Sequence, residues 1–105
     1  MAWLLLLAAG AVEIVMAIAL KYAEGWTRPV PSVIGVGAAL LSIFLLTHAV
    51  RYLPAGTAYV IWTGIGAIGT ALAGVVLFGE SASPLRLVCI GVIVAGVMGL
   101  KFADA

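Results

Sequence analysis

Glu13 is the residue with the clearest chemical potential in this sequence. It is the only charged side chain in the segment 2–20, an apolar run long enough to cross a bilayer. A charged carboxylate at that depth costs about 2.5–3.5 kcal/mol on insertion scales, so such residues are typical of functional sites. Because removal from water disfavours the charged form of a carboxyl group, a proton and an organic cation would compete for Glu13. The structural alternative is a hydrogen bond, or an ion pair with Lys101.

Several uncharged residues have types and positions that would suit a cation held by Glu13. Gly10 lies three residues before Glu13 on the same helical face, and Met16 flanks that face. Aromatic rings attract cations, although Tyr and Trp also form belts at membrane interfaces. We therefore predict a proton and substrate site that consists of Glu13, Trp62, Tyr59, Ser42, Gly10 and Met16.

The composition is that of an integral membrane protein. The chain has 105 residues, of which 66% are hydrophobic and 9% are charged, whereas a soluble domain carries roughly a quarter charged residues. Charges, glycines and prolines divide it into four apolar segments, with Ser83 and Pro84 as the expected N-cap and first residue of the last helix. We predict one all-α domain over residues 1–105, with transmembrane helices at 2–20, 31–50, 56–79 and 84–102.

Other function classes find little support in the sequence. A net charge of +1 without a basic stripe gives no reason to expect nucleic acid. Cys89 is the only cysteine, so neither an intrachain disulfide nor a metal cluster is expected. The glycines of 64–69 match a dinucleotide-binding pattern, but they lie inside an apolar span with no strand before them. We therefore expect that the chain is not an enzyme and that it binds neither a metal nor a cofactor.

The last segment carries a pattern that is typical of helix association in membranes. Gly91, Ala95 and Gly99 are each four residues apart, and small residues at this spacing let two helix backbones approach closely. Four short-looped helices also enclose little interior space. We therefore predict that the chain is an oligomer and that these three residues pack at the interface.

The sequence resembles the small multidrug resistance family over essentially its whole length. The resemblance rests on Glu13, on EGWTRPVPS at 24–32, on LPAGTAYVIWTGIGAIG at 53–69 and on FGES at 78–81. The WTGIGA stretch, together with GLK at 99–101, is similar to the guanidinium-exporter subtype, the SugE-like branch.

The resemblance implies a proton-coupled antiporter of the bacterial inner membrane that exports guanidinium or small guanidinyl cations. It implies an antiparallel, dual-topology homodimer in which two Glu13 carboxylates face one pocket and the proton is the coupling ion. A heterodimer with a homologous chain is the alternative assembly. Ser42, Tyr59 and Trp62 match pocket positions of the family, and Gly10 and Lys101 match positions of the subtype, with a transport role for Lys101.

Met16 departs from the subtype, which usually has tryptophan at this position. A methionine is flexible and offers no N–H donor, so it favours a wider pocket. The first alternative function is therefore a broader exporter of quaternary ammonium and other lipophilic cations. A more distant alternative is a proton-binding subunit of a membrane assembly. Such subunits usually hold their carboxylate on a late helix, whereas Glu13 is on the first.

Overall fold

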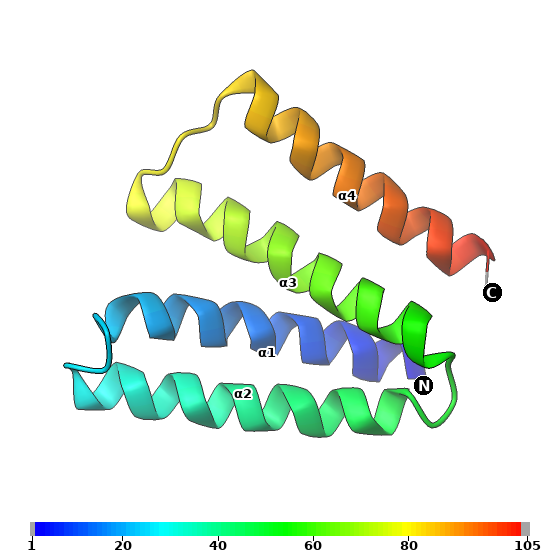
Figure 1. Ribbon diagram of the computed structural model, residues 1–105, viewed down its shortest axis with the longest axis horizontal. Helices are drawn as coiled ribbons and strands as arrows, with labels where there is room; N and C mark the ends of the chain where they lie inside the picture. The colour runs from blue at the N-terminus through cyan, green and yellow to red at the C-terminus, as the bar shows by residue number, and fades with distance from the viewer. Residues whose placement is uncertain (1, 104–105) are drawn as a thin grey trace.

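The computed structural model describes residues 2–103 and consists of four helices that run up and down (Figure 1). They are α1 (Ala2–Tyr22), α2 (Pro29–Ala49), α3 (Ala55–Phe78) and α4 (Pro84–Ala103). Each helix is long and apolar enough to cross a membrane. The predicted all-α fold with four transmembrane helices is confirmed, and the helix ends differ from the predicted ranges by at most two residues.

Local sequence signals explain where the helices begin and end. α2 begins at Pro29, ahead of the predicted start, because proline fits the first turn of a helix, where its missing N–H has no partner to lose. α3 ends at Phe78, just before Gly79, whose φ of 64° is a left-handed conformation that glycine adopts readily. At α4 the predicted cap is confirmed, since the Ser83 hydroxyl accepts a hydrogen bond of 3.3 Å from the backbone N–H of Arg86.

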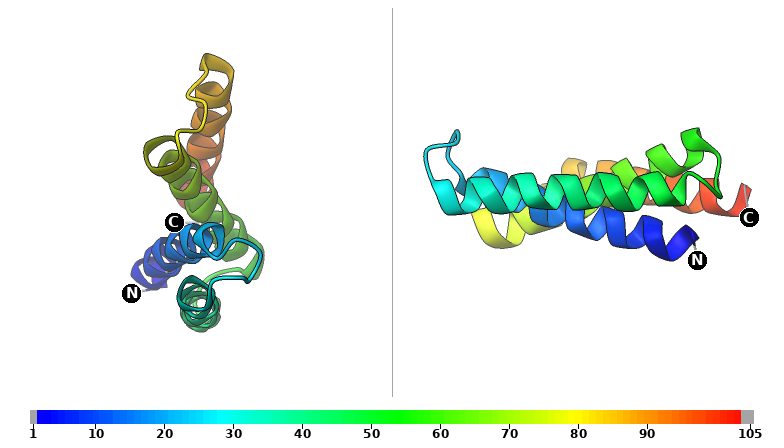
Figure 2. Two further views of the ribbon diagram at one scale, coloured as in Figure 1. Left: turned by 90° about the vertical axis from the view of Figure 1, so that its left-hand side faces the viewer. Right: turned by 90° about the horizontal axis from the view of Figure 1, so that it is seen from below.

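The helices pack unequally. α1 contacts both α2 and α3, whereas α4 contacts α3 alone among the described helices. Figure 2 shows α4 standing away from the other three, at one edge of a flat molecule. The extents are 42 × 35 × 17 Å, so the slab is at most about two helices thick, given a helix diameter of about 10 Å. A single copy of the chain therefore encloses little interior space.

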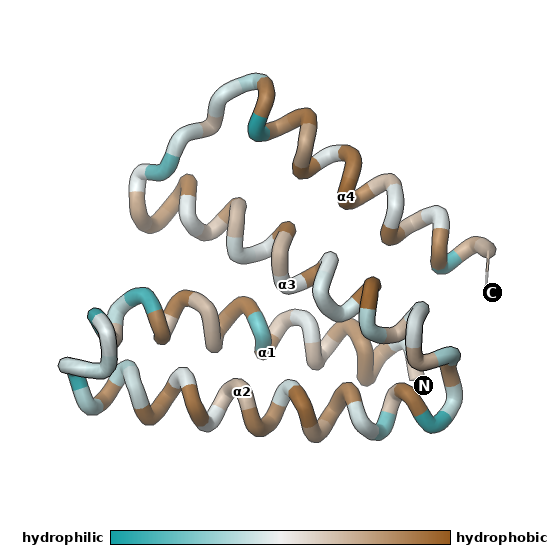
Figure 3. Tube along the Cα trace, in the orientation of Figure 1, coloured by the Kyte–Doolittle hydropathy of each residue, from teal (hydrophilic) through white to brown (hydrophobic). Residues whose placement is uncertain are grey.

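The buried core is small and lies near one end of the bundle. Its members come from the start of α1, the end of α2 and the start of α3, namely Leu6, Ala49, Ala58 and Ile61. In α4 no described residue is buried. Figure 3 shows hydrophilic colour concentrated at loops and helix ends, and again in the middle of α1, the helix that carries Glu13. Most of the apolar surface thus faces outward, as lipid contact requires.

Candidate functional site

Glu13 lies in the middle of α1 with its carboxylate directed at α3. The side chain is half-buried and lies against the backbone of Gly66. A Cβ atom built on Gly66 would overlap Oε1 of Glu13, so the carboxylate occupies space that only a glycine leaves free. The sequence did not predict this contact. Gly66 is therefore part of the site.

The Glu13 carboxylate makes no hydrogen bond or ion pair within residues 2–103. Glu13 does not form the ion pair with Lys101 that the sequence left open as an alternative. The Lys101 Nζ lies instead over the ring of Trp3, 5.6 Å from its centroid. A carboxyl group in an apolar setting is either neutralised by a proton or paired with a cation. The carboxylate oxygens of Glu13 are free to bind either a proton or a cation.

Ser42 connects three helices one turn from Glu13. Its hydroxyl donates a hydrogen bond of 2.7 Å to the carbonyl oxygen of Ala9 and accepts one of 2.9 Å from Nε1 of Trp62. Ser42 is 1% exposed. In a regular helix the Ala9 carbonyl also accepts from the backbone N–H of Glu13. The predicted residues Ser42 and Trp62 therefore form one network, which fixes the indole ring against the helix that carries the carboxylate.

Tyr59 and Thr63 lie on the side of α3 that faces α4. The Tyr59 ring packs against Trp62, with centroids 5.6 Å apart and planes tilted by 59°. Tyr59 is 59% exposed. Together with Thr63 it lines a groove of about 580 Å³ between α3 and α4. Tyr59 thus contacts Trp62 on one side and lines the α3–α4 groove on the other.

Gly10 and Met16 flank Glu13 along α1. Gly10 is buried, and a Cβ there would overlap the side chain of Ile65 on α3. Gly10 therefore acts through close packing of α1 on α3, which holds Glu13 over Gly66. Met16 is half-buried and lies about one turn beyond the carboxylate.

The predicted packing residues of α4 lie on an open surface. Gly91, Ala95 and Gly99 are all exposed, and a Cβ built on either glycine would meet nothing within 4 Å. They do not contribute to the surroundings of Glu13. Of the described helices, only α3 packs against α4, so this face is available to another molecule.

One polar contact was not expected from the sequence. Glu80 lies in the loop between α3 and α4 and Arg86 in the first turn of α4, and no sequence pattern pairs them. The structure instead joins them in an ion pair, with Nη2 of Arg86 2.7 Å from Oε1 of Glu80. The two residues are six positions apart across a non-helical loop, a spacing that helix periodicity does not bring together.

Comparison with known proteins places these features in a family. A family model described as Small Multidrug Resistance protein matches residues 1–93. A protein named guanidinium exporter from Citrobacter freundii is 55% identical over 103 residues, 98% of either chain. One of the same name from Salmonella typhimurium matches equally. A third, from Yersinia pseudotuberculosis, is 54% identical over 104 residues, 99% of this chain and 100% of the relative.

Proposed function

This chain belongs to the small multidrug resistance family, and we propose that it is a proton-coupled antiporter that exports guanidinium or small guanidinyl cations. The membership confirms the prediction of a multi-pass transporter of the bacterial inner membrane, not an enzyme. Full-length identity of 55% to proteins named guanidinium exporter supports the same substrate class here.

The observation that carries the proposal is the carboxylate of Glu13 in the middle of α1, which has no hydrogen-bond or ion-pair partner among residues 2–103. One negative charge can be neutralised by one proton or by one substrate cation, but not by both together. Protonation on one side of the membrane therefore releases the substrate there. Loss of the proton on the other side restores the binding charge. Export against a gradient follows when the site faces the two sides alternately.

The surroundings of Glu13 suit a guanidinium ion. This planar cation donates parallel N–H bonds to both oxygens of a carboxylate and stacks on aromatic rings. Because the Nε1–H of Trp62 is already donated to Ser42, the indole offers a substrate its ring face and not its N–H group. The ring is also held in place by the Ser42 network, so little conformational entropy is lost when a cation binds.

An antiparallel homodimer would complete this site. α4 has no buried residue among those described and packs only on α3. The exposed Gly91, Ala95 and Gly99 support close contact with the α4 of a second copy. The thin slab of one protomer would become a two-sided enclosure, with one Glu13 from each copy facing the centre. A homologous chain as the second partner is the alternative assembly.

A wider substrate range is the second candidate function, and Met16 favours it. Its flexible thioether lies about one turn from Glu13, where the guanidinium-exporter subtype usually carries tryptophan. A flexible side chain can move aside for a bulky cation. Quaternary ammonium ions offer no N–H donor, so they would depend on charge and ring contacts alone.

Transport by the purified chain in liposomes tests the proposal. A proton gradient is imposed, and substrate movement is measured for guanidinium and for tetraethylammonium. We expect guanidinium uptake into acidic vesicles together with proton efflux. The Glu13→Gln variant, which has the same shape but cannot ionise, should fold and show no coupled exchange. Undiminished guanidinium–proton exchange by this variant would refute the assignment of Glu13.

A further inference from the structure

A second charged cluster lies beyond Glu13, where α3 joins α4. A pocket of about 380 Å³ opens there between α1, α3 and the loop 79–83. Its rim carries three charged side chains, Lys21, Glu80 and Arg86. The site around Glu13 does not use any of them.

The pocket extends from this rim toward Glu13. One of its walls includes Ala17, which lies four residues after Glu13 and therefore on the same face of α1. The opposite wall includes Ala67, the neighbour of Gly66, against which the Glu13 carboxylate lies. The pocket is thus a vestibule between the carboxylate and the loop end of the bundle.

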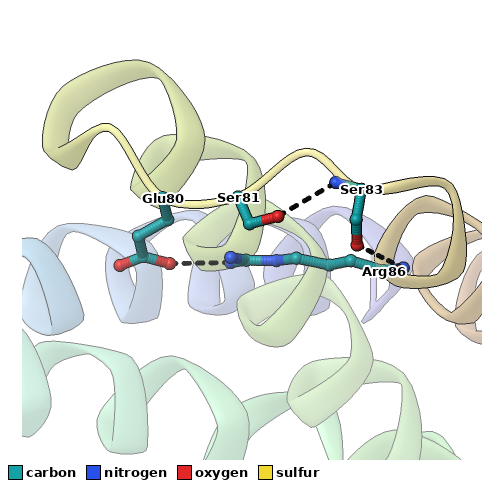
Figure 4. Close-up of polar contacts among 4 residues, drawn as sticks. All are labelled: Glu80, Ser81, Ser83 and Arg86. Carbon is teal, nitrogen blue, oxygen red and sulfur yellow. Dashed lines mark hydrogen bonds and ion pairs between the residues drawn. The ribbon is translucent and has the colours of Figure 1, made fainter.

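Two of the three charged side chains form an ion pair at the loop end of this vestibule. Figure 4 shows the Arg86 side chain reaching back along the loop to Glu80, with Nη2 and Oε1 2.7 Å apart. Glu80 is anchored to the end of α3, since its backbone N–H donates to the carbonyl oxygen of Gly74 at 3.1 Å. Arg86 belongs to the first turn of α4, which the Ser83 hydroxyl caps. The pair therefore ties α4 to α3 across the opening.

The charges at the mouth oppose the passage of a cation while the pair is formed. Arg86 occupies the one carboxylate among the described residues of the rim, and the Lys21 Nζ lies 5.9 Å from the centre of the Phe78 ring. The rim then carries a net positive charge. If Arg86 moves away, Glu80 becomes a free acceptor for a cation. A guanidinium ion is the same chemical group that holds Glu80 in the paired state.

We propose that Glu80 and Arg86 form an ionic gate at the mouth of the vestibule, which closes this end of the pathway and which a guanidinium substrate can open by replacing Arg86 at Glu80. The gate rests on the proposed transport function. Both partners are partly exposed, with 30% of Arg86 and 41% of Glu80 accessible. Exposed pairs are weak, so this one can open and close many times during transport. A strong buried pair would hold the loop in one state.

The test measures access to the vestibule directly, without transport. Cys89 is changed to serine, Thr70 in the vestibule wall is changed to cysteine, and Glu13→Gln is included to remove the inner site. The labelling rate with an uncharged thiol reagent is then measured in nanodiscs. We expect Glu80→Gln and Arg86→Gln to raise the rate roughly two- to fivefold, the shift that an exposed ion pair can supply.

Two controls separate the gate from a general loosening of the loop. Glu24→Gln removes an exposed loop carboxylate at the same end of the bundle and should leave the rate unchanged. The exchange of the two charges in Glu80→Arg/Arg86→Glu should restore slow labelling. The proposal would be overturned if the protein with both Glu80 and Arg86 labelled as fast as the two single variants. It would also be overturned if the variant with exchanged charges labelled as fast as the single variants.

Added guanidinium tests the second part of the proposal in the same background. It should speed labelling when Glu80 and Arg86 are present and have no effect when Glu80 is glutamine. Sodium at the same ionic strength is the control for screening. A guanidinium effect that persists in Glu80→Gln would overturn the replacement step. Because Glu13 is absent from all these proteins, failure of the gate is distinguishable from failure of guanidinium export.

Discussion

The carboxylate of Glu13 on α1 occupies the space that Gly66 on α3 leaves by having no side chain. This relationship couples helix packing to chemistry. Gly10, one turn earlier on α1, has the reverse relationship with Ile65, so the two helices interlock on both sides of the carboxylate. The position of the charge is therefore set by glycines on both helices. Small changes where α1 packs against α3 should affect transport more than stability.

The first prediction concerns Gly66→Ala. Its added methyl group would overlap Oε1 of Glu13 and force the carboxylate out of its place. Because displacement of a reacting group by about 1 Å can cost roughly a hundredfold in rate, we expect guanidinium transport to fall by at least about tenfold. Transport in liposomes is measured against Gly37→Ala, a matched change on α2 where a Cβ meets nothing within 4 Å. Equal transport by the two variants would contradict the packing argument.

The second prediction concerns Ser42→Ala. This change removes both the acceptor for Trp62 Nε1 and the hydrogen bond to the Ala9 carbonyl. Leaving a polar group without its partner costs about 1–3 kcal/mol, so we expect lower thermal stability and weaker guanidinium binding together. Ser32→Ala on the same helix is the control, because its hydroxyl bonds only the backbone of Arg28 one turn away. Unchanged binding in Ser42→Ala would show that the indole needs no such support.

The sequence predicted the fold well and the site only in part. Apolar length, loop prolines and the Ser83 cap are local signals, and local signals set helix number and helix ends. The importance of Glu13 could be predicted because a lone charge in an apolar span is conspicuous without any structure. The contact between Glu13 and Gly66 depends on the rotation of α3 against α1, and the Glu80–Arg86 pair depends on the path of a loop. Helix periodicity predicts neither of them.

The third prediction concerns selectivity at Met16. Met16→Trp fills space about one turn from Glu13 and adds an N–H donor, which should disfavour bulky cations. We expect the ratio of guanidinium to tetraethylammonium transport to rise by about tenfold, a shift within the range that pocket size can supply. Met98→Trp, the same change at an exposed position of α4, should leave the ratio unaltered. If both variants leave it unaltered, position 16 does not set selectivity.

The fourth prediction is dual topology, and it follows from the charges at the two ends of the bundle. The end with the 50–54 turn carries Arg51 and Lys101, whereas the end with both other loops carries Lys21, Arg28 and Arg86. Orientation follows the difference in Lys and Arg between short loops. Two against three is a weak bias, so both orientations should be populated. Inverted copies would pair about an axis in the membrane plane, which lets one site open to either side.

Labelling of a single cysteine measures the two orientations. Cys89 is changed to serine and Thr27, an uncharged residue of the first loop, to cysteine, so that the charge balance stays intact. An impermeant thiol reagent applied from one side of the membrane should label about half of the protein. Arg51→Gln makes the balance one against three, so the first loop should move inward and labelling from outside should fall well below half. Complete labelling from one side in the parent protein would rule out dual topology for this chain.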